Sequence, residues 1–169
     1  MDALIVDDIL DDFVYGKLKS SRAASIIPKT KRLISAARHA KVPVIYVCDA
    51  HLDRDPEIKV WGPHAMKGSH GARVVDELKP RREDYVLEKR TYSSFHETGL
   101  DLLLRDLRVD SVVIVGRPHR NSAFSLQRRQ RLYERPNTNR RRRKNYALVC
   151  ATSFDQCSIK LSLVVILAP

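Results

Sequence analysis

Apolar runs and amphipathic stretches alternate along the first two-thirds of the chain. Four short runs are apolar at nearly every position, which is typical of buried strands: Ala3–Val6, Pro43–Cys48, Tyr85–Leu87 and Ser111–Val115. Three longer stretches have apolar residues at helical spacing and predict helices: Ala23–Ala40, Ala72–Leu78 and Leu100–Leu107. This alternation predicts a three-layer α/β fold, in which helices flank a mainly parallel sheet.

Charged side chains follow three of the predicted strands. Asp8 comes just after the first strand, Asp49 after the second, and Lys89 after the third. Ligands of parallel sheets bind beyond the carboxyl ends of the strands, where these residues lie together with the segment after Gly116. The sequence therefore predicts a polar site at this edge, with Asp8 and Lys89 close together.

The basic charge of the chain is concentrated in its last third. Residues 1–116 carry 19 Lys and Arg against 18 Asp and Glu, whereas residues 117–169 carry 12 against 2. We therefore divide the chain into an α/β domain core, residues 1–116, and a divergent Arg-rich segment, residues 117–169, which we expect to be degraded or poorly ordered.

The composition of the chain limits the cellular compartments and the classes of partner that we expect. At 169 residues the chain suits one domain, and its acidic N-terminus is unlike a signal segment. The longest apolar stretch, Leu161–Ala168, is too short to span a membrane. The three cysteines, Cys48, Cys150 and Cys157, lack the spacing of a disulfide framework or a zinc ribbon. We expect a reduced, cytoplasmic protein that has no membrane partner.

Five short motifs occur in an order that resembles the isochorismatase/nicotinamidase family of cysteine hydrolases. They are Asp8–Phe13 (D-I-L-D-D-F), Val42–His51 (V-P-V-I-Y-V-C-D-A-H), Trp61–His64 (W-G-P-H), Tyr85–Phe95 (Y-V-L-E-K-R-T-Y-S-S-F) and Val109–Gly116. The first is similar to the family's D-M-Q-N-D-F, except that Leu10 replaces Gln and Asp11 replaces Asn. The resemblance implies the family's α/β fold, a small-molecule substrate and assembly into homo-oligomers.

The resemblance also implies a reaction, the hydrolysis of a small amide such as nicotinamide, or of a related small molecule. Asp8 matches the family's catalytic base and Lys89 its catalytic lysine, although an isolated Asp8 also suits a turn cap. The family's nucleophilic cysteine lies six positions beyond the glycine that matches Gly116, and Ser122 stands there. Since a serine hydroxyl is much harder to deprotonate than a thiol, we expect impaired activity.

Asp49, His51 and His64 offer one carboxylate and two imidazoles, a set that accepts Zn or another divalent metal. The matching residues of nicotinamidases bind a metal, whereas the residues alone also suit loop histidines and a capping aspartate. Phe13 and Trp61 resemble the aromatic walls of the family's substrate pocket. Without the resemblance, both are equally typical of a core.

Two explanations fit the run of arginines in Arg117–Lys144. A change of translation frame is one, because the helix that the family has here is replaced by arginine and glutamine with few acids. In that case we expect poor packing and no sixth strand, except for one that Tyr146–Cys150 could form. The rival is a non-catalytic protein whose basic arm, residues 117–144, binds nucleic acid through phosphates, although neither a regular interleaving of aromatic residues nor a recognised fold accompanies the arginines.

A response-regulator receiver domain is a further alternative, because such domains often open like Leu4–Asp8 (L-I-V-D-D). A receiver needs a phosphate-accepting aspartate after its third strand. The third strand here ends instead in Glu88 and Lys89, which argues against this fold.

Overall fold

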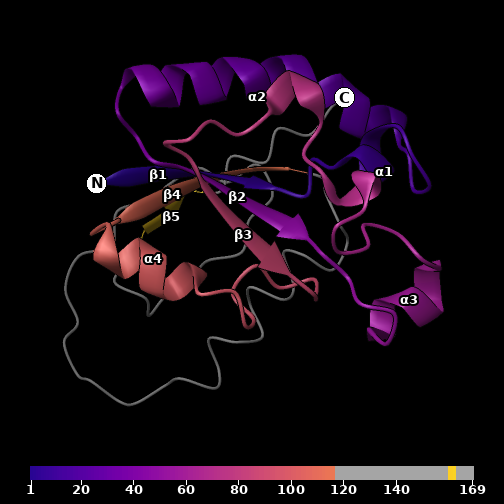
Figure 1. The fold of residues 1–169 in the computed structure, drawn as a ribbon. Helices are drawn as coiled ribbons and strands as arrows, with labels where there is room; N and C mark the ends of the chain where they lie inside the picture. The colour runs from indigo at the N-terminus through magenta and orange to yellow at the C-terminus, as the bar shows by residue number, and fades with distance from the viewer. Residues whose placement is uncertain (117–159, 163–169) are drawn as a thin grey trace.

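The computed structural model describes residues 1–116 and 160–162 of the chain (Figure 1). Its sheet has the strand order β3-β2-β1-β4-β5, and every pair of neighbours is parallel. The strands are β1 (Asp2–Asp7), β2 (Val44–Asp49), β3 (Tyr85–Lys89), β4 (Ser111–Gly116) and β5 (Lys160–Ser162). The α-helices are α1 (Asp11–Val14), α2 (Ser21–His39), α3 (Pro56–Trp61) and α4 (Leu100–Asp106), and two 3₁₀ helices are η1 (His70–Ala72) and η2 (Asp76–Leu78).

Helices cover both faces of the sheet, as the fully apolar strands require. In β1, Leu4 and Val6 pack in the core beneath α2, while Ala3 and Ile5 pack in the core against α4. Figure 1 shows α2 and α4 on opposite sides of the strands. The three-layer α/β architecture with a parallel sheet is therefore confirmed.

The register places the carboxyl ends of four strands at one edge. Asp7 at the end of β1 lies opposite Val47 of β2 and Gly116 of β4, and Asp49 of β2 lies opposite Lys89 of β3. The end of β4 approaches β1 so closely that a Cβ added to Gly116 would overlap the backbone of Asp7. A glycine is required there because no other residue leaves room for the neighbouring chain.

The predicted helix over Ala72–Leu78 is wrong. Only the ends of this segment are helical, in η1 and η2, and both turns are 3₁₀. Between them Val74 forms an antiparallel bridge with Leu10, and the Val75 amide donates to the carbonyl of Ile9 at 3.2 Å. These backbone pairings with the chain after β1 compete with helical hydrogen bonds, so tertiary contacts override the helical spacing.

Three elements were not predicted: α1, α3 and β5. Lys160–Ser162 forms a fifth strand, which pairs with β4 from Ser111 to Val113, and the prediction of no sixth strand stays a prediction. Alternation of apolar and polar residues around Lys160 is the signal that favours this strand. Ser122, Tyr146–Cys150 and the run of arginines all lie outside the described residues. Within the described part of the chain, none of the helices is both long and apolar enough to cross a membrane.

Candidate active site

The structure brings Lys89 together with both aspartates that follow the neighbouring strands. The Lys89 ammonium donates to Asp8 Oδ2 at 2.6 Å, and it also donates to Asp49 Oδ1. Only 1% of the lysine side chain is exposed. The predicted proximity of Asp8 and Lys89 is confirmed, and one buried ammonium joins the ends of β1, β2 and β3.

The backbone at Asp8 turns the carboxylate toward this lysine. Asp8 has φ of 52°, in the left-handed region that residues other than glycine rarely adopt. Its amide donates to the Val47 carbonyl at 3.1 Å, while its Oδ1 accepts from the Asp49 amide at 2.9 Å. The strain at Asp8 is therefore held in place by two hydrogen bonds to β2.

Burial and mutual contacts set the charge states of these three groups. Burial raises the pKa of Asp8 well above its ordinary value, and the Asp49 carboxylate adds to this, while Lys89 opposes it. Burial also acts to raise the pKa of Asp49, but contacts with His51 and Lys89 outweigh it and leave that pKa lowered. Burial disfavours the Lys89 ammonium, yet the carboxylates around it raise its pKa above the ordinary value. The arrangement thus pairs a firmly charged lysine with a more basic carboxylate, Asp8.

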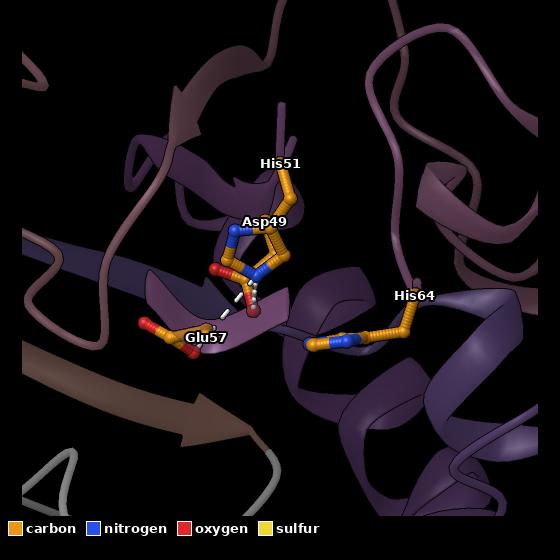
Figure 2. A group of neighbouring side chains, drawn as sticks. All are labelled: Asp49, His51, Glu57 and His64. Atoms are coloured by element: carbon orange, nitrogen blue, oxygen red, sulfur yellow. Dashed lines mark ion pairs between the residues drawn. The ribbon is translucent and has the colours of Figure 1, made fainter. Parts of the chain in front are cut away.

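Next to this pair, four side chains converge in a cluster suited to a metal ion (Figure 2). Asp49 ends β2, His51 follows two residues later, Glu57 lies in the first turn of α3, and His64 lies in the loop after α3. All four are buried, and their candidate ligand atoms lie within 4.8 Å of one another. The structure therefore brings together the three ligands predicted from sequence and adds Glu57, which the sequence analysis missed.

Carboxylates surround the ring of His51, but the ring makes no hydrogen bond of good geometry to any of them. Its Nε2 lies 3.5 Å from Asp49 Oδ2 and 3.9 Å from Glu57 Oε2, and its Nδ1 lies 3.4 Å from Asp55 Oδ2. Among the residues that the structure describes, neither ring nitrogen has a hydrogen-bond partner, although both are buried. Since buried polar atoms are nearly always satisfied, this ring fits a cation held beside it.

The ring of His64 is oriented by its own loop. Its Nδ1 lies 2.7 Å from the Gly62 carbonyl. A carbonyl only accepts, so Nδ1 carries the proton and Nε2 keeps a free lone pair. Burial lowers the pKa of His64, which favours the neutral ring that a metal requires.

Glu57 and Asp55 differ sharply in charge although both flank His51. Burial raises the pKa of Glu57 to about 7, and the nearby Asp49 carboxylate adds to the effect. Hydrogen bonds from Arg90 lower the pKa of Asp55 to about 2, with help from the Leu52 amide. Asp55 is therefore a permanent carboxylate behind His51, whereas Glu57 gains its charge when a cation is near.

The two aromatic residues predicted to line the pocket lie in different surroundings. Phe13 is buried in the core beneath α2, with its ring centroid 5.7 Å from that of His64. Trp61 is 47% exposed at the end of α3, where its indole donates to the Tyr92 hydroxyl at 2.7 Å. Phe13 thus backs His64 from the core side, and Trp61 presents an aromatic surface to solvent.

Two further buried groups, Cys48 and Asp7, lie near the site. Cys48 is buried in the core beneath α2, where burial raises the pKa of its thiol, so it is unsuited to attack a substrate. Asp7 is buried on the opposite face and accepts from the Ser94 hydroxyl at 2.8 Å. Ser122, at the position of the family's cysteine, lies outside the described residues.

The isochorismatase domain family matches residues 2–117. The chain belongs to this family. It is 30% identical over 126 residues to a probable inactive nicotinamidase of Arabidopsis thaliana, a match that covers 68% of this chain and 64% of that protein. It is 28% identical over 120 residues to enterobactin synthase component B of Escherichia coli K12, covering 68% of this chain and 42% of that protein. The chain spans less than two thirds of the length of these relatives.

Solved structures of the isochorismatase family have the same architecture. An N-carbamoylsarcosine amidase from Thermoplasma acidophilum is 39% identical, with a TM-score of 0.71 and coverage of 76% of both chains. A pyrazinamidase of Pyrococcus horikoshii in complex with zinc is 24% identical, with a TM-score of 0.67 and coverage of 75% of this chain and 78% of that one. At that identity the second likeness shows the shared fold alone.

Replacing Lys89 by methionine is expected to lower the free energy of unfolding by about 3–5 kcal/mol, because Asp8 and Asp49 lose their buried counter-ion. Without the lysine both carboxyls bind protons more readily in the folded state than in the unfolded state. The deficit should therefore shrink as the pH falls from 8 to 5. Urea unfolding at several pH values measures both effects.

Lys67→Met is the matched control, because the Lys67 ammonium pairs with Glu88 at 2.5 Å while both side chains are more than half exposed. We expect it to cost less than about 1 kcal/mol. Equal losses in the two variants would contradict the role of Lys89 as a buried counter-ion.

Proposed function

We propose that the chain is the scaffold of a small-amide hydrolase in which Asp8, Lys89 and Ser122 occupy the catalytic positions. Nicotinamide-like amides, or related small molecules, are the proposed substrates, and Ser122 in place of cysteine impairs the reaction. The bridge from Lys89 to both Asp8 and Asp49 supports this assignment most directly. Burying three charged groups together costs desolvation free energy, and such groups cluster at functional sites.

The geometry suits a proton acceptor beside a fixed positive charge. In the proposed reaction, Asp8 takes the proton of the nucleophile, whose oxygen or sulfur then attacks the substrate carbonyl carbon. The proton passes to the leaving amine, and water later cleaves the acyl-enzyme. Lys89 stabilises the negative charge that develops, because its pKa lies above the ordinary value and it keeps its proton throughout. A serine at position 122 slows the first step, since Asp8 is too weak a base for a hydroxyl.

A divalent metal fits the second part of the site. Asp49, His51, Glu57 and His64 supply two imidazoles and two carboxylates, a donor set that suits zinc. A metal bound there would act as a Lewis acid on a substrate heteroatom and orient the substrate. Asp49 touches both the lysine and His51, so it would connect the metal to the catalytic pair.

We further propose that the exposed indole of Trp61 forms one wall of the substrate pocket. Phe13 supports the pocket from the core side, through its contact with the ring of His64. A homo-oligomer in the cytoplasm remains the prediction from sequence, as does the absence of a membrane partner.

For the domain organisation we propose that residues 1–116 are the hydrolase core and residues 117–169 a divergent segment produced by a frame change. The reach of the family match, which ends at residue 117, supports this division. Sequencing the gene on both strands tests the frame change. An intact reading frame would favour the alternative, a basic nucleic-acid-binding arm.

Changing Ser122 to cysteine is expected to raise nicotinamide hydrolysis at least tenfold over the unmodified chain, because a thiol loses its proton far more readily than a hydroxyl. Ammonia release measures the rate. Adding Asp8→Asn to the Ser122→Cys variant should abolish the gain, because the amide accepts no proton. A Ser122→Cys variant no more active than the parent, or one that Asp8→Asn leaves unaffected, would contradict the assignment.

Zinc binding is expected at one ion per chain, and His51→Ala should remove it because the central ring is lost. Glu57→Gln should weaken binding by about tenfold or more, since one anionic ligand becomes neutral. Calorimetric titration of metal-free protein with Zn²⁺ measures both. His70→Ala is the control, because His70 is an exposed histidine in η1 outside the cluster. Equal zinc affinity in His51→Ala and the parent chain would overturn the proposed metal site.

A further inference from the structure

Asp12 belongs to the first motif of the sequence, yet the proposed reaction gives it no role. Its half-buried carboxylate reaches from α1 to the loop that carries His64. Asp12 Oδ2 accepts from the Ala65 amide at 2.8 Å, and Oδ1 accepts from the Lys17 amide at 3.3 Å. The first bond spans 53 positions of sequence and ends one residue beyond a proposed metal ligand.

Ala65 joins the segments of both histidines of the cluster. It follows His64 directly, and its carbonyl accepts from the His51 amide at 2.9 Å. The Lys67 amide donates in turn to the His51 carbonyl at 2.9 Å. Contacts that fix the backbone of Ala65 therefore also restrain the backbone of His51 and His64.

The backbone conformation of Ala65 is strained and persists only if such contacts hold it. Ala65 is fully buried and has φ of 42°, in the left-handed region, where a side chain is strained. Such conformations persist only where the surroundings impose them. The hydrogen bond to the Asp12 carboxylate and the bond to His51 are the contacts that impose it here.

Gly71 and Lys17 also help to hold the contact between Asp12 and the loop that carries His64. Gly71 of η1 lies directly against the Asp12 carboxylate, so that a Cβ added at this position would overlap it. The Lys17 ammonium donates to the Pro63 carbonyl at 2.9 Å, on the other side of His64. Together these contacts fasten the loop at residues 63 and 65 and leave the His64 side chain between the two points.

We propose that Asp12 is a positioning residue that clamps Ala65 and thereby holds His64 within reach of Asp49, His51 and Glu57. The proposal rests on the metal site of the proposed function, but the clamp itself exists in the metal-free protein. Asp12 touches neither metal nor substrate and acts only through the backbone of the loop. Its removal leaves all four ligands in the chain while loosening the position of one.

The first test measures Zn²⁺ affinity by calorimetry on metal-free protein. Asp12→Ala is expected to weaken binding at least tenfold, as losses of supporting contacts around metal ligands typically do. Asp12→Asn keeps a carbonyl oxygen as acceptor and should restore most of the affinity. Asp11→Asn is the matched control, because Asp11 neighbours Asp12 in α1 but contacts the exposed His70, and it should bind zinc like the parent chain.

A second variant reaches the same carboxylate from the opposite side. Gly71→Ala should push the Asp12 carboxylate away from the Ala65 amide and so lower zinc affinity as Asp12→Ala does. In the double variant Asp12→Ala/Gly71→Ala the overlap is gone, so the two effects should be far from additive. A merely structural role of Asp12 would lower the midpoint of thermal unfolding while the folded protein kept its zinc affinity.

Amide hydrogen exchange in the metal-free protein tests the clamp separately from the metal. Asp12→Ala should accelerate exchange at Ala65, His51 and Lys67 and leave the amides of β4 unchanged. If the parent chain binds no zinc, the proposed metal site fails, while faster exchange at these amides still supports the clamp. Unchanged exchange at Ala65, or parental zinc affinity in a folded Asp12→Ala variant, would overturn the clamp.

Discussion

The buried ammonium of Lys89 holds the carboxyl ends of three neighbouring strands to one another. The ends of β1, β2 and β3 each bring one charged group to the same point, and the lysine offsets the repulsion between the two aspartates, Asp8 and Asp49. The left-handed turn at Asp8 and the register of β2 against β3 bring the carboxylates of Asp8 and Asp49 within reach of this ammonium. Because Asp49 also faces His51, the same ammonium fixes one side of the candidate metal cluster.

Acidic groups outnumber cationic ones within this part of the structure. Asp7, Asp49 and Glu57 are buried and the Asp8 side chain is 13% exposed, whereas Lys89 is the ammonium that contacts both Asp8 and Asp49. The raised pKa of Asp7, Asp8 and Glu57 reflects this excess together with burial. A bound cation would offset this excess of negative charge. The metal cluster and the catalytic pair are therefore linked by the same excess of carboxylates. The same excess suits a base at Asp8, since a carboxylate with a raised pKa accepts a proton more readily.

The sequence predicted the sheet and much of the site because both depend on short-range patterns. Runs that are apolar at nearly every position marked four strands, and the charged residues after three of them marked the edge where Asp8, Asp49 and Lys89 meet. Glu57 was missed because its place depends on the direction in which α3 leaves β2, which no local pattern encodes. Asp55, Pro56 and Glu57 together favour a helix start, and this signal predicts α3 without placing its first turn against His51.

The other failures have similar causes. The helical spacing of Ala72–Leu78 yielded to backbone pairing with the chain after β1, a contact between segments far apart in sequence. Phe13 packs in the core and its ring lies beside that of His64, so the core interpretation of this residue holds and its role in the pocket stays a prediction. The strand at Lys160–Ser162 was missed because its alternating pattern is short and runs into a longer apolar stretch, Leu161–Ala168.

The charge state of Lys89 tests the central claim most directly. Nitrogen-detected NMR of lysine-labelled protein follows each ammonium as the pH rises, and Lys89→Met assigns the signal. Because the Asp8 and Asp49 carboxylates raise the pKa of Lys89, its ammonium should remain fully charged at pH 10.5, where an ordinary lysine is about half deprotonated. A Lys89 that loses its proton at a lower pH than an ordinary lysine would be a desolvated lysine without its carboxylate partners, and would contradict the account.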